Sequence, residues 1–319
     1  MMNENRNQSH KITRRKFLKT SLALSAASAI SFSFPKIVRS TPATLTIRGF
    51  IDPYGVAVSP NGTIYVTDAG GYCVHIFDEK GTPIRRVGQP GSGAGQFNYP
   101  QGIAIDADTS DVYVVDSNNG RVVILDALGN YKQQFGAVGG YPEAFYTPKG
   151  IFVRDKIYVC NTRNHMLAVY DKSTLSLVAN FGDLGDDPKN LARGSSDYRF
   201  RIVTDVAVAE NGTIYVVDSK HGQVKVLSSD GMFQFKFSEN GSGKGQLNLP
   251  EAISLDGQQN VYVCDTVNGR IQKFTPEGGF IGVWTEGLKR PVSISIDAAS
   301  RLYVTDSELK QVNVFSWSM

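Results

Sequence analysis

Short apolar runs recur along residues 44–319 of this chain, separated by turns rich in glycine, asparagine and proline. One type of run starts with proline at five of its six places: 53–58, 100–105, 148–153, 203–208, 250–255 and 291–296. A second type ends in Tyr-Val-x-Asp or Tyr-Val-x-Asn: 64–68, 112–116, 157–161, 214–218, 261–265 and 302–306. Runs of five or six residues bounded by turns, without a helical period, are typical of β-strands.

Each repeated unit contains two further runs, of which 122–125 is an example of the third and 84–88 of the fourth. Four strands per unit of this length predict the blade of a β-propeller. Strands inside a blade are covered on both faces, which explains runs that are nearly all apolar. We therefore predict an all-β protein, a six-bladed propeller with four antiparallel strands per blade.

The last unit stops after its third run, 312–315, and an additional apolar run, 44–48, precedes the first unit. We predict that residues 44–48 supply the outer strand of the sixth blade. This pairing would join the two ends of the domain and remove an exposed sheet edge.

The units carry a motif that resembles the NHL repeat. Asp116 is followed by Asn119-Gly120-Arg121 and Asp265 by Asn268-Gly269-Arg270, while Gly-rich loops occupy 91–97 and 241–247. The other four units depart from the motif at the arginine, where they have Cys73, Met166, Gln223 and Gln311. The resemblance covers residues 44–319 and implies the propeller fold but no particular function, because propellers host many chemistries.

The net charge of +3 is divided unevenly along the chain. Residues 1–40 contain eight basic residues and one acid, which leaves 25 basic and 29 acidic residues in the remainder. A mildly acidic domain disfavours general affinity for polyanions, because that affinity depends on neutralising phosphates. Nucleic acid is therefore not an expected partner.

Residues 1–40 have the organisation of a signal peptide, with a basic stretch up to Lys19 and a modestly apolar stretch over 20–34. We divide the chain into this leader, 1–40, and a propeller, 41–319. The apolar stretch is short and rich in serine, so it is a poor membrane span. Only an uncleaved leader would attach the protein to a membrane.

Within the leader, residues 13–19 resemble the twin-arginine export motif, which is carried by Arg14, Arg15, Phe17 and Leu18. That pathway moves proteins that have already folded. The resemblance implies an encounter with the twin-arginine (Tat) export machinery and a final location in the periplasm or elsewhere outside the cytoplasmic membrane.

Alternating strand direction sorts the loops of a propeller onto two faces. Loops between second and third strands share one face with the connections between blades, and loops between first and second strands lie opposite. Basic residues concentrate on the first face, and acidic residues such as Glu210, Asp256 and Asp297 on the second. We predict a partner-binding face made of Arg121, Arg163, His165, Lys220, His221 and Arg270; ordinary solvated turns are the alternative reading.

The innermost strands begin on the basic face, just after the proline. We therefore expect Tyr54, Gln101, Lys149, Thr204 and Glu251 to surround the channel mouth. Their mixed polarity is consistent with a small polar ligand and equally with a water-filled channel.

Signals of metal binding or catalysis are few. His165 and His221 occupy equivalent loops of neighbouring blades, and an NHL-like enzyme family, the peptidyl-hydroxyglycine amidating lyases, binds zinc through histidines over the channel. A catalytic zinc usually takes three protein ligands, and no third ligand is evident here. We assign no catalytic residue, metal or cofactor, and leave zinc and calcium open.

The cysteines Cys73, Cys160 and Cys264 fall in alternate blades. Neighbouring packed sheets lie about 10 Å apart, so cysteines in alternate blades are too far apart to form a disulfide. We expect three free, buried thiols.

The leading functional hypothesis is a monomeric, non-enzymatic scaffold that binds an extracytoplasmic protein, or a glycan, through the basic face. The alternative is a propeller enzyme, a lyase or hydrolase, with a metal or substrate site over the channel. RNA binding, known for some NHL domains, is a third possibility that the domain charge and the leader oppose.

Overall fold

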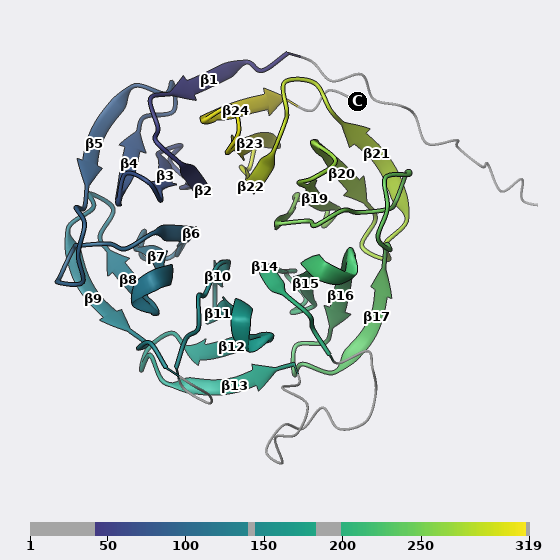
Figure 1. Ribbon diagram of the computed structural model, residues 1–319, viewed down its shortest axis with the longest axis horizontal. Coiled ribbons are helices and arrows are strands. Elements are labelled where there is room, and N and C mark those ends of the chain that lie inside the picture. The colour runs from purple at the N-terminus through teal and green to yellow at the C-terminus, as the bar shows by residue number, and fades with distance from the viewer. Residues whose placement is uncertain (1–41, 140–143, 183–198, 317–319) are drawn as a thin grey trace, which may run out of the picture. The chain divides into compact units, whose positions relative to one another are not determined.

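The computed structural model describes residues 42–139, 144–182 and 199–316. These residues form six four-stranded antiparallel sheets, arranged as blades around a central axis (Figure 1). The predicted six-bladed propeller is thus confirmed. The export-motif residues Arg14, Arg15, Phe17 and Leu18 lie outside the described residues.

The strands of each blade are numbered outward from the axis, except that β1 closes the sixth blade. Blade 1 contains β2 (Pro53–Val58), β3 (Ile64–Asp68), β4 (Cys73–Phe77) and β5 (Pro83–Val87). Blade 2 contains β6 (Pro100–Ile105), β7 (Val112–Asp116), β8 (Arg121–Leu125) and β9 (Tyr131–Phe135). Blade 3 contains β10 (Ile151–Val153), β11 (Lys156–Asn161), β12 (Met166–Asp171) and β13 (Leu177–Phe181). Blade 4 contains β14 (Val203–Val208), β15 (Ile214–Asp218), β16 (Gln223–Leu227) and β17 (Phe233–Phe237). Blade 5 contains β18 (Ala252–Leu255), β19 (Val261–Asp265), β20 (Arg270–Phe274) and β21 (Phe280–Trp284). Blade 6 contains β22 (Pro291–Ile296), β23 (Arg301–Asp306), β24 (Gln311–Ser316) and β1 (Leu45–Arg48).

Short 3-10 helices follow the second strands of blades 2, 3 and 4: η1 (Ser117–Asn119), η2 (Thr162–Asn164) and η4 (Ser219–His221). Each ends at a residue in the left-handed region, where glycine is favoured. In η2 that residue is His165, with φ of 56°. In the part of the chain that the structure describes, no helix is long and apolar enough to cross a membrane.

The ring is closed between the first and the last strand. β1 pairs with β24 in antiparallel register, from Leu45 opposite Val314 to Arg48 opposite Gln311. Figure 1 shows β1 on the rim beside β24, outside β23 and β22. The prediction that residues 44–48 complete the sixth blade is confirmed.

The core lies between blades. Six clusters of buried apolar side chains are found in the described residues, one at each junction of neighbouring blades. Second strands such as β3 and β7 are buried at every position, whereas outer strands such as β5 and β9 are exposed at four of five. The three cysteines are free and buried, as expected.

Hydrogen bonds confirm how the loops are sorted. The N–H of Ala69, after β3, donates to the carbonyl of Asp52 in the connection from blade 6, at 2.9 Å. The N–H of Arg163, after β11, donates likewise to the carbonyl of Tyr146, at 3.2 Å. We call the side with these paired loops the upper face, and the side with the loops between first and second strands the lower face.

Candidate functional site

The residue that ends each second strand anchors the loop entering its blade. The carboxylate Oδ1 of Asp116 accepts the Asn98 N–H at 2.7 Å, and Oδ1 of Asp265 accepts the Asn248 N–H at 2.7 Å. Equivalent bonds occur in the other four blades, at Asp68, Asn161, Asp218 and Asp306. These repeated side chains are therefore structural.

Two of the predicted binding residues point into the fold. The Nε of Arg121 lies 2.8 Å from Oδ2 of Asp116, and the other guanidinium donors reach the Gln134 side chain and carbonyls of the Gly-rich loop. Arg270 repeats this arrangement with Asp265, at 2.6 Å. The expectation that these two arginines face a partner needs correction, because their donors are used inside the blade.

The other four predicted binding residues lie in upper-face loops. Arg163 is exposed and stacks over the Tyr146 ring, with 5.6 Å between its guanidinium carbon and the ring centre. Lys220 is exposed, and the half-exposed His221 holds its Nδ1 2.7 Å from Oδ2 of Asp218. His165 is mostly covered, and its Nδ1 has no hydrogen-bond partner among the described residues.

The upper face also carries exposed apolar side chains that the sequence analysis did not single out. Tyr146 is 47% exposed, Val138 65% and Val267 50%. Ile51 and Tyr99 belong to the same set of loops, and these five make up half of the large apolar residues that the described chain exposes. The upper-face loops thus expose aromatic and aliphatic groups, of which Tyr146 lies beside Arg163.

Three of the predicted mouth residues converge on the axis from alternate blades. Oε2 of Glu251 accepts a hydrogen bond from the Tyr54 hydroxyl at 2.9 Å and pairs with Nζ of Lys149 at 2.8 Å. The Lys149 ammonium also lies 5.7 Å from the centre of the Tyr54 ring. Burial and the neighbouring Glu251 charge raise the pKa of Tyr54 well above its usual value, which keeps the phenol a hydrogen-bond donor.

The other two mouth residues are turned away from this cluster. Gln101 is buried, and its side-chain oxygen accepts the Ser117 hydroxyl at 3.0 Å. The Thr204 hydroxyl donates to the Pro250 carbonyl at 3.2 Å. The Gln101 side chain therefore bonds within blade 2, whereas Thr204 connects blade 4 to blade 5.

The innermost strands crowd one another at the mouth, which explains the glycine in the Pro-x-Gly runs. The N–H of Gly102 donates to the Lys149 carbonyl at 3.0 Å. A Cβ at Gly102 would lie 2.1 Å from that carbonyl oxygen, so no larger residue fits without moving the backbone.

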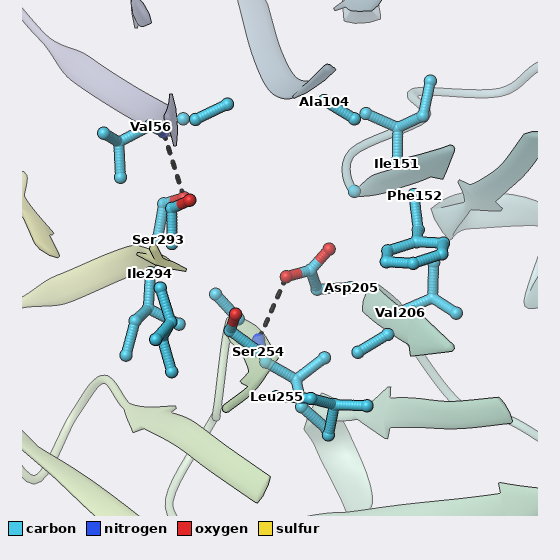
Figure 2. Close-up of a pocket in the computed structure, with 18 of the residues that line it drawn as sticks. Val56, Ala104, Ile151, Phe152, Asp205, Val206, Ser254, Leu255, Ser293 and Ile294 are labelled. Carbon is cyan, nitrogen blue, oxygen red and sulfur yellow. Dashed lines mark hydrogen bonds between the residues drawn. The ribbon is translucent and has the colours of Figure 1, made fainter. Parts of the chain in front are cut away.

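A cavity of about 450 Å³ extends along the channel below the mouth. Its wall is formed by inner-strand residues and mixes apolar side chains such as Ile151, Phe152 and Ile294 with the polar Ser254 and Ser293 (Figure 2). At the lower face the lining becomes acidic, with Glu210, Asp256 and Asp297. The cavity is large enough for a small molecule or a short peptide end.

Asp205 places a carboxyl group inside this cavity, as Figure 2 shows. Its Oδ2 accepts the Ile253 N–H of the next blade at 3.0 Å. Burial raises the pKa of Asp205 to about 7, and the Glu251 charge adds to the rise, against backbone hydrogen bonds that favour the carboxylate. A carboxyl group with this pKa can exchange a proton near neutral pH.

The signal for Asp205 was present in the repeat. Asp205 occupies the place of Gly55, Gly102 and Gly150 in the first three units. A Cβ at Gly150 would lie 2.3 Å from Oδ1 of Asp205, so the glycine of blade 3 leaves room for the acid of blade 4.

Among the described residues, no group of potential metal ligands includes His165 or His221, the two loop histidines considered above. One group of potential ligands does occur in the described residues, namely Asp68, Cys73 and His75 in blade 1. Burial opposes a charge on His75, but its hydrogen bonds with Asp68 and Cys73 prevail and raise its pKa to about 9. The partner Asp68 is also buried, yet His75 and three backbone N–H groups lower its pKa to about 2.

Profiles of known families match two parts of the propeller. One for a six-bladed beta-propeller matches residues 53–123, and one for the NHL repeat matches residues 247–274. Together with the geometry, these matches define the chain as a six-bladed β-propeller in which residues 247–274 match the NHL repeat.

Similar proteins include NHL repeat-containing protein 3 of Homo sapiens, 28% identical over 199 residues, or 55% of each chain. The E3 ubiquitin-protein ligase NHLRC1 of Rattus norvegicus is 25% identical over 83% of this chain and 67% of its own length. A probable peptidyl-alpha-hydroxyglycine alpha-amidating lyase of Caenorhabditis elegans, pgal-1, is 31% identical over 69% of this chain and 55% of its own. The chain thus spans about half the length of the human and nematode relatives.

Proposed function

We propose that this propeller is an interaction scaffold that binds a partner protein through its upper face. The observation that carries the proposal is the set of exposed apolar side chains, Tyr146 and Val267 among them, in the upper-face loops. Aromatic and arginine side chains that stay exposed on a rigid surface are enriched in protein interfaces. The likeness to a ubiquitin-protein ligase supports a role in contact with other proteins.

The test compares the two faces of the propeller. A tagged chain is cross-linked in the producing cell, the captured protein is identified, and its affinity for the purified propeller is measured. The upper-face changes Tyr146→Ser, Arg163→Glu and Lys220→Glu should each weaken binding at least tenfold without changing the melting temperature. Matched lower-face changes, Leu128→Ser and Lys80→Glu, should leave affinity unchanged. Equal loss from both faces would overturn the proposal.

We also propose that the protein works outside the cytoplasmic membrane after twin-arginine export. The support is the leader sequence with Arg14 and Arg15 followed by Phe17 and Leu18. Conversion of both arginines to lysine should leave the folded protein in the cytoplasmic fraction, whereas Lys16→Arg should be exported normally. Export of the double-lysine variant would refute the assignment.

A second candidate is an enzyme that uses the channel, and Asp205 is the observation that favours it. A buried acid with a pKa of about 7 that lines a cavity is typical of a general acid or base. The likeness to an amidating lyase suggests a peptidyl-α-hydroxyglycine as the first substrate to test. If the wild type releases the amidated peptide and the Asp205→Asn variant does not, this candidate is supported. If the wild type shows no turnover, the interaction scaffold stays as the proposed function.

A further inference from the structure

The blade 1 hairpin brings three side chains of different chemistry onto one face. Asp68 ends β3 and lies directly opposite Cys73, the first residue of β4. His75 follows Cys73 by two residues, so strand alternation points both to the same side. The Cys73 Sγ is 3.4 Å from Nε2 of His75, and this nitrogen is 3.5 Å from Oδ2 of Asp68.

The other blades show what this place in the repeat requires. The equivalents of Cys73 in blades 2 and 5 are Arg121 and Arg270, each paired with the acid of its own blade. In blade 4 the equivalent of His75 is Lys225, whose Nζ lies 3.3 Å from Oδ2 of Asp218. A positive group beside the buried acid thus recurs in blades 2, 4 and 5. Blade 1 places a thiol and an imidazole at this position, the two side chains that zinc prefers.

The distances match those of a metal site. A tetrahedral zinc with bonds of about 2.3 Å to sulfur and about 2.0 Å to nitrogen and oxygen sets its sulfur and nitrogen ligands about 3.5 Å apart, and its nitrogen and oxygen ligands about 3.3 Å apart. The observed separations are 3.4 Å and 3.5 Å, and all three ligand atoms lie within 4.8 Å of one another.

We propose that Asp68, Cys73 and His75 bind one zinc ion in blade 1. The Cys73 thiolate and the Asp68 carboxylate would balance the charge of the ion, which takes the place that Arg121 has in blade 2. Arg86, opposite His75 on β5, donates to the Gly71 carbonyl at 2.8 Å. The His75 side chain is 20% exposed, so water can reach the fourth position. The site lies on the second and third strands and is separate from the channel.

Zinc titration of the purified full-length chain tests the proposal. After dialysis against chelator and then against zinc, the wild type should hold one zinc per chain. Cys73→Ser and His75→Gln should each weaken zinc binding at least tenfold. Cys160→Ser and Cys264→Ser are matched controls, because these thiols are equally buried. They should bind zinc as wild type does.

Cobalt(II) gives a readout that does not depend on the variants folding. Wild type loaded with cobalt should show a thiolate-to-cobalt absorption band and the strong visible bands of tetrahedral coordination. Zinc should raise the melting temperature of wild type but not of Cys73→Ser. Absence of the thiolate band in wild type, or zinc binding that survives both ligand changes, would mean that Asp68 and His75 form an ion pair only.

Discussion

The guanidinium Nε of Arg121 lies 2.8 Å from the carboxylate Oδ2 of Asp116, and both side chains are buried in blade 2. The same arginine donates to the carbonyls of Ser92, Gly93 and Gln96. One side chain therefore connects the acid of the second strand to the Gly-rich loop that enters the blade. This relationship explains why arginine and the Gly-rich loop occur together in the second and fifth units.

Arg121→Gln should destabilise the propeller markedly. The change leaves Asp116 buried without its charged partner, which costs about 3–5 kcal/mol in comparable cases. Urea unfolding of the variant measures the loss. Arg163→Gln removes an equally charged but exposed side chain and should stay within about 0.5 kcal/mol of wild type. An Arg121 variant as stable as the Arg163 variant would show that the buried pair contributes little.

Ile47→Ala should weaken the closure of the ring. Ile47 is 5% exposed and packs with Phe50, Val56 and Val312 between the sixth and first blades. Removal of such a side chain costs about 2–5 kcal/mol, so the melting temperature should fall by several degrees. Arg48→Ala, one residue along the same strand and exposed, is the control and should melt like wild type. Equal melting of the two variants would mean that β1 contributes little to stability.

The repeat made most of the fold predictable. Each unit supplies the same strands and turns, so blade number, strand order and even the closing strand follow from comparing units within the chain. Side-chain direction was harder to predict at the ends of strands. We expected Arg121 on the surface because its loop is on the surface. Its guanidinium group instead pairs with the buried carboxylate of Asp116, five residues earlier.

Residues that depart from the repeat pattern mark the places where side chains with distinct chemistry lie in the fold. Asp205 replaces a glycine on an innermost strand, and it reaches the cavity because Gly150 leaves space beside it. Likewise, Cys73 and His75 stand apart from Asp68 in sequence, and only the register of the hairpin brings them together. A comparison of equivalent positions across blades, together with strand alternation, would have indicated both places.

The buried acid of the channel should make stability depend on pH. An unfolded aspartate has a pKa of about 3.9, whereas that of Asp205 in the folded protein is about 7. Between these values the folded protein retains a proton that the unfolded chain has released. The contribution of Asp205 to stability therefore falls as pH rises through this interval, and it stays level above about pH 7.

Melting curves of wild type and Asp205→Asn between pH 4 and 8 test this dependence. The variant keeps an oxygen for the Ile253 N–H but carries no charge, so its advantage over wild type should grow with pH and then become constant. In the Glu251→Gln variant, which keeps Asp205, the pH at which the melting temperature stops falling should be lower than in the wild type. The reason is that the Glu251 charge helps to raise the pKa of Asp205. Asp155→Asn, at a carboxyl that is 64% exposed, is the control. Parallel curves for wild type and Asp205→Asn would show that folding does not raise the pKa of Asp205, which would remove the chemical reason to regard the channel as a catalytic site.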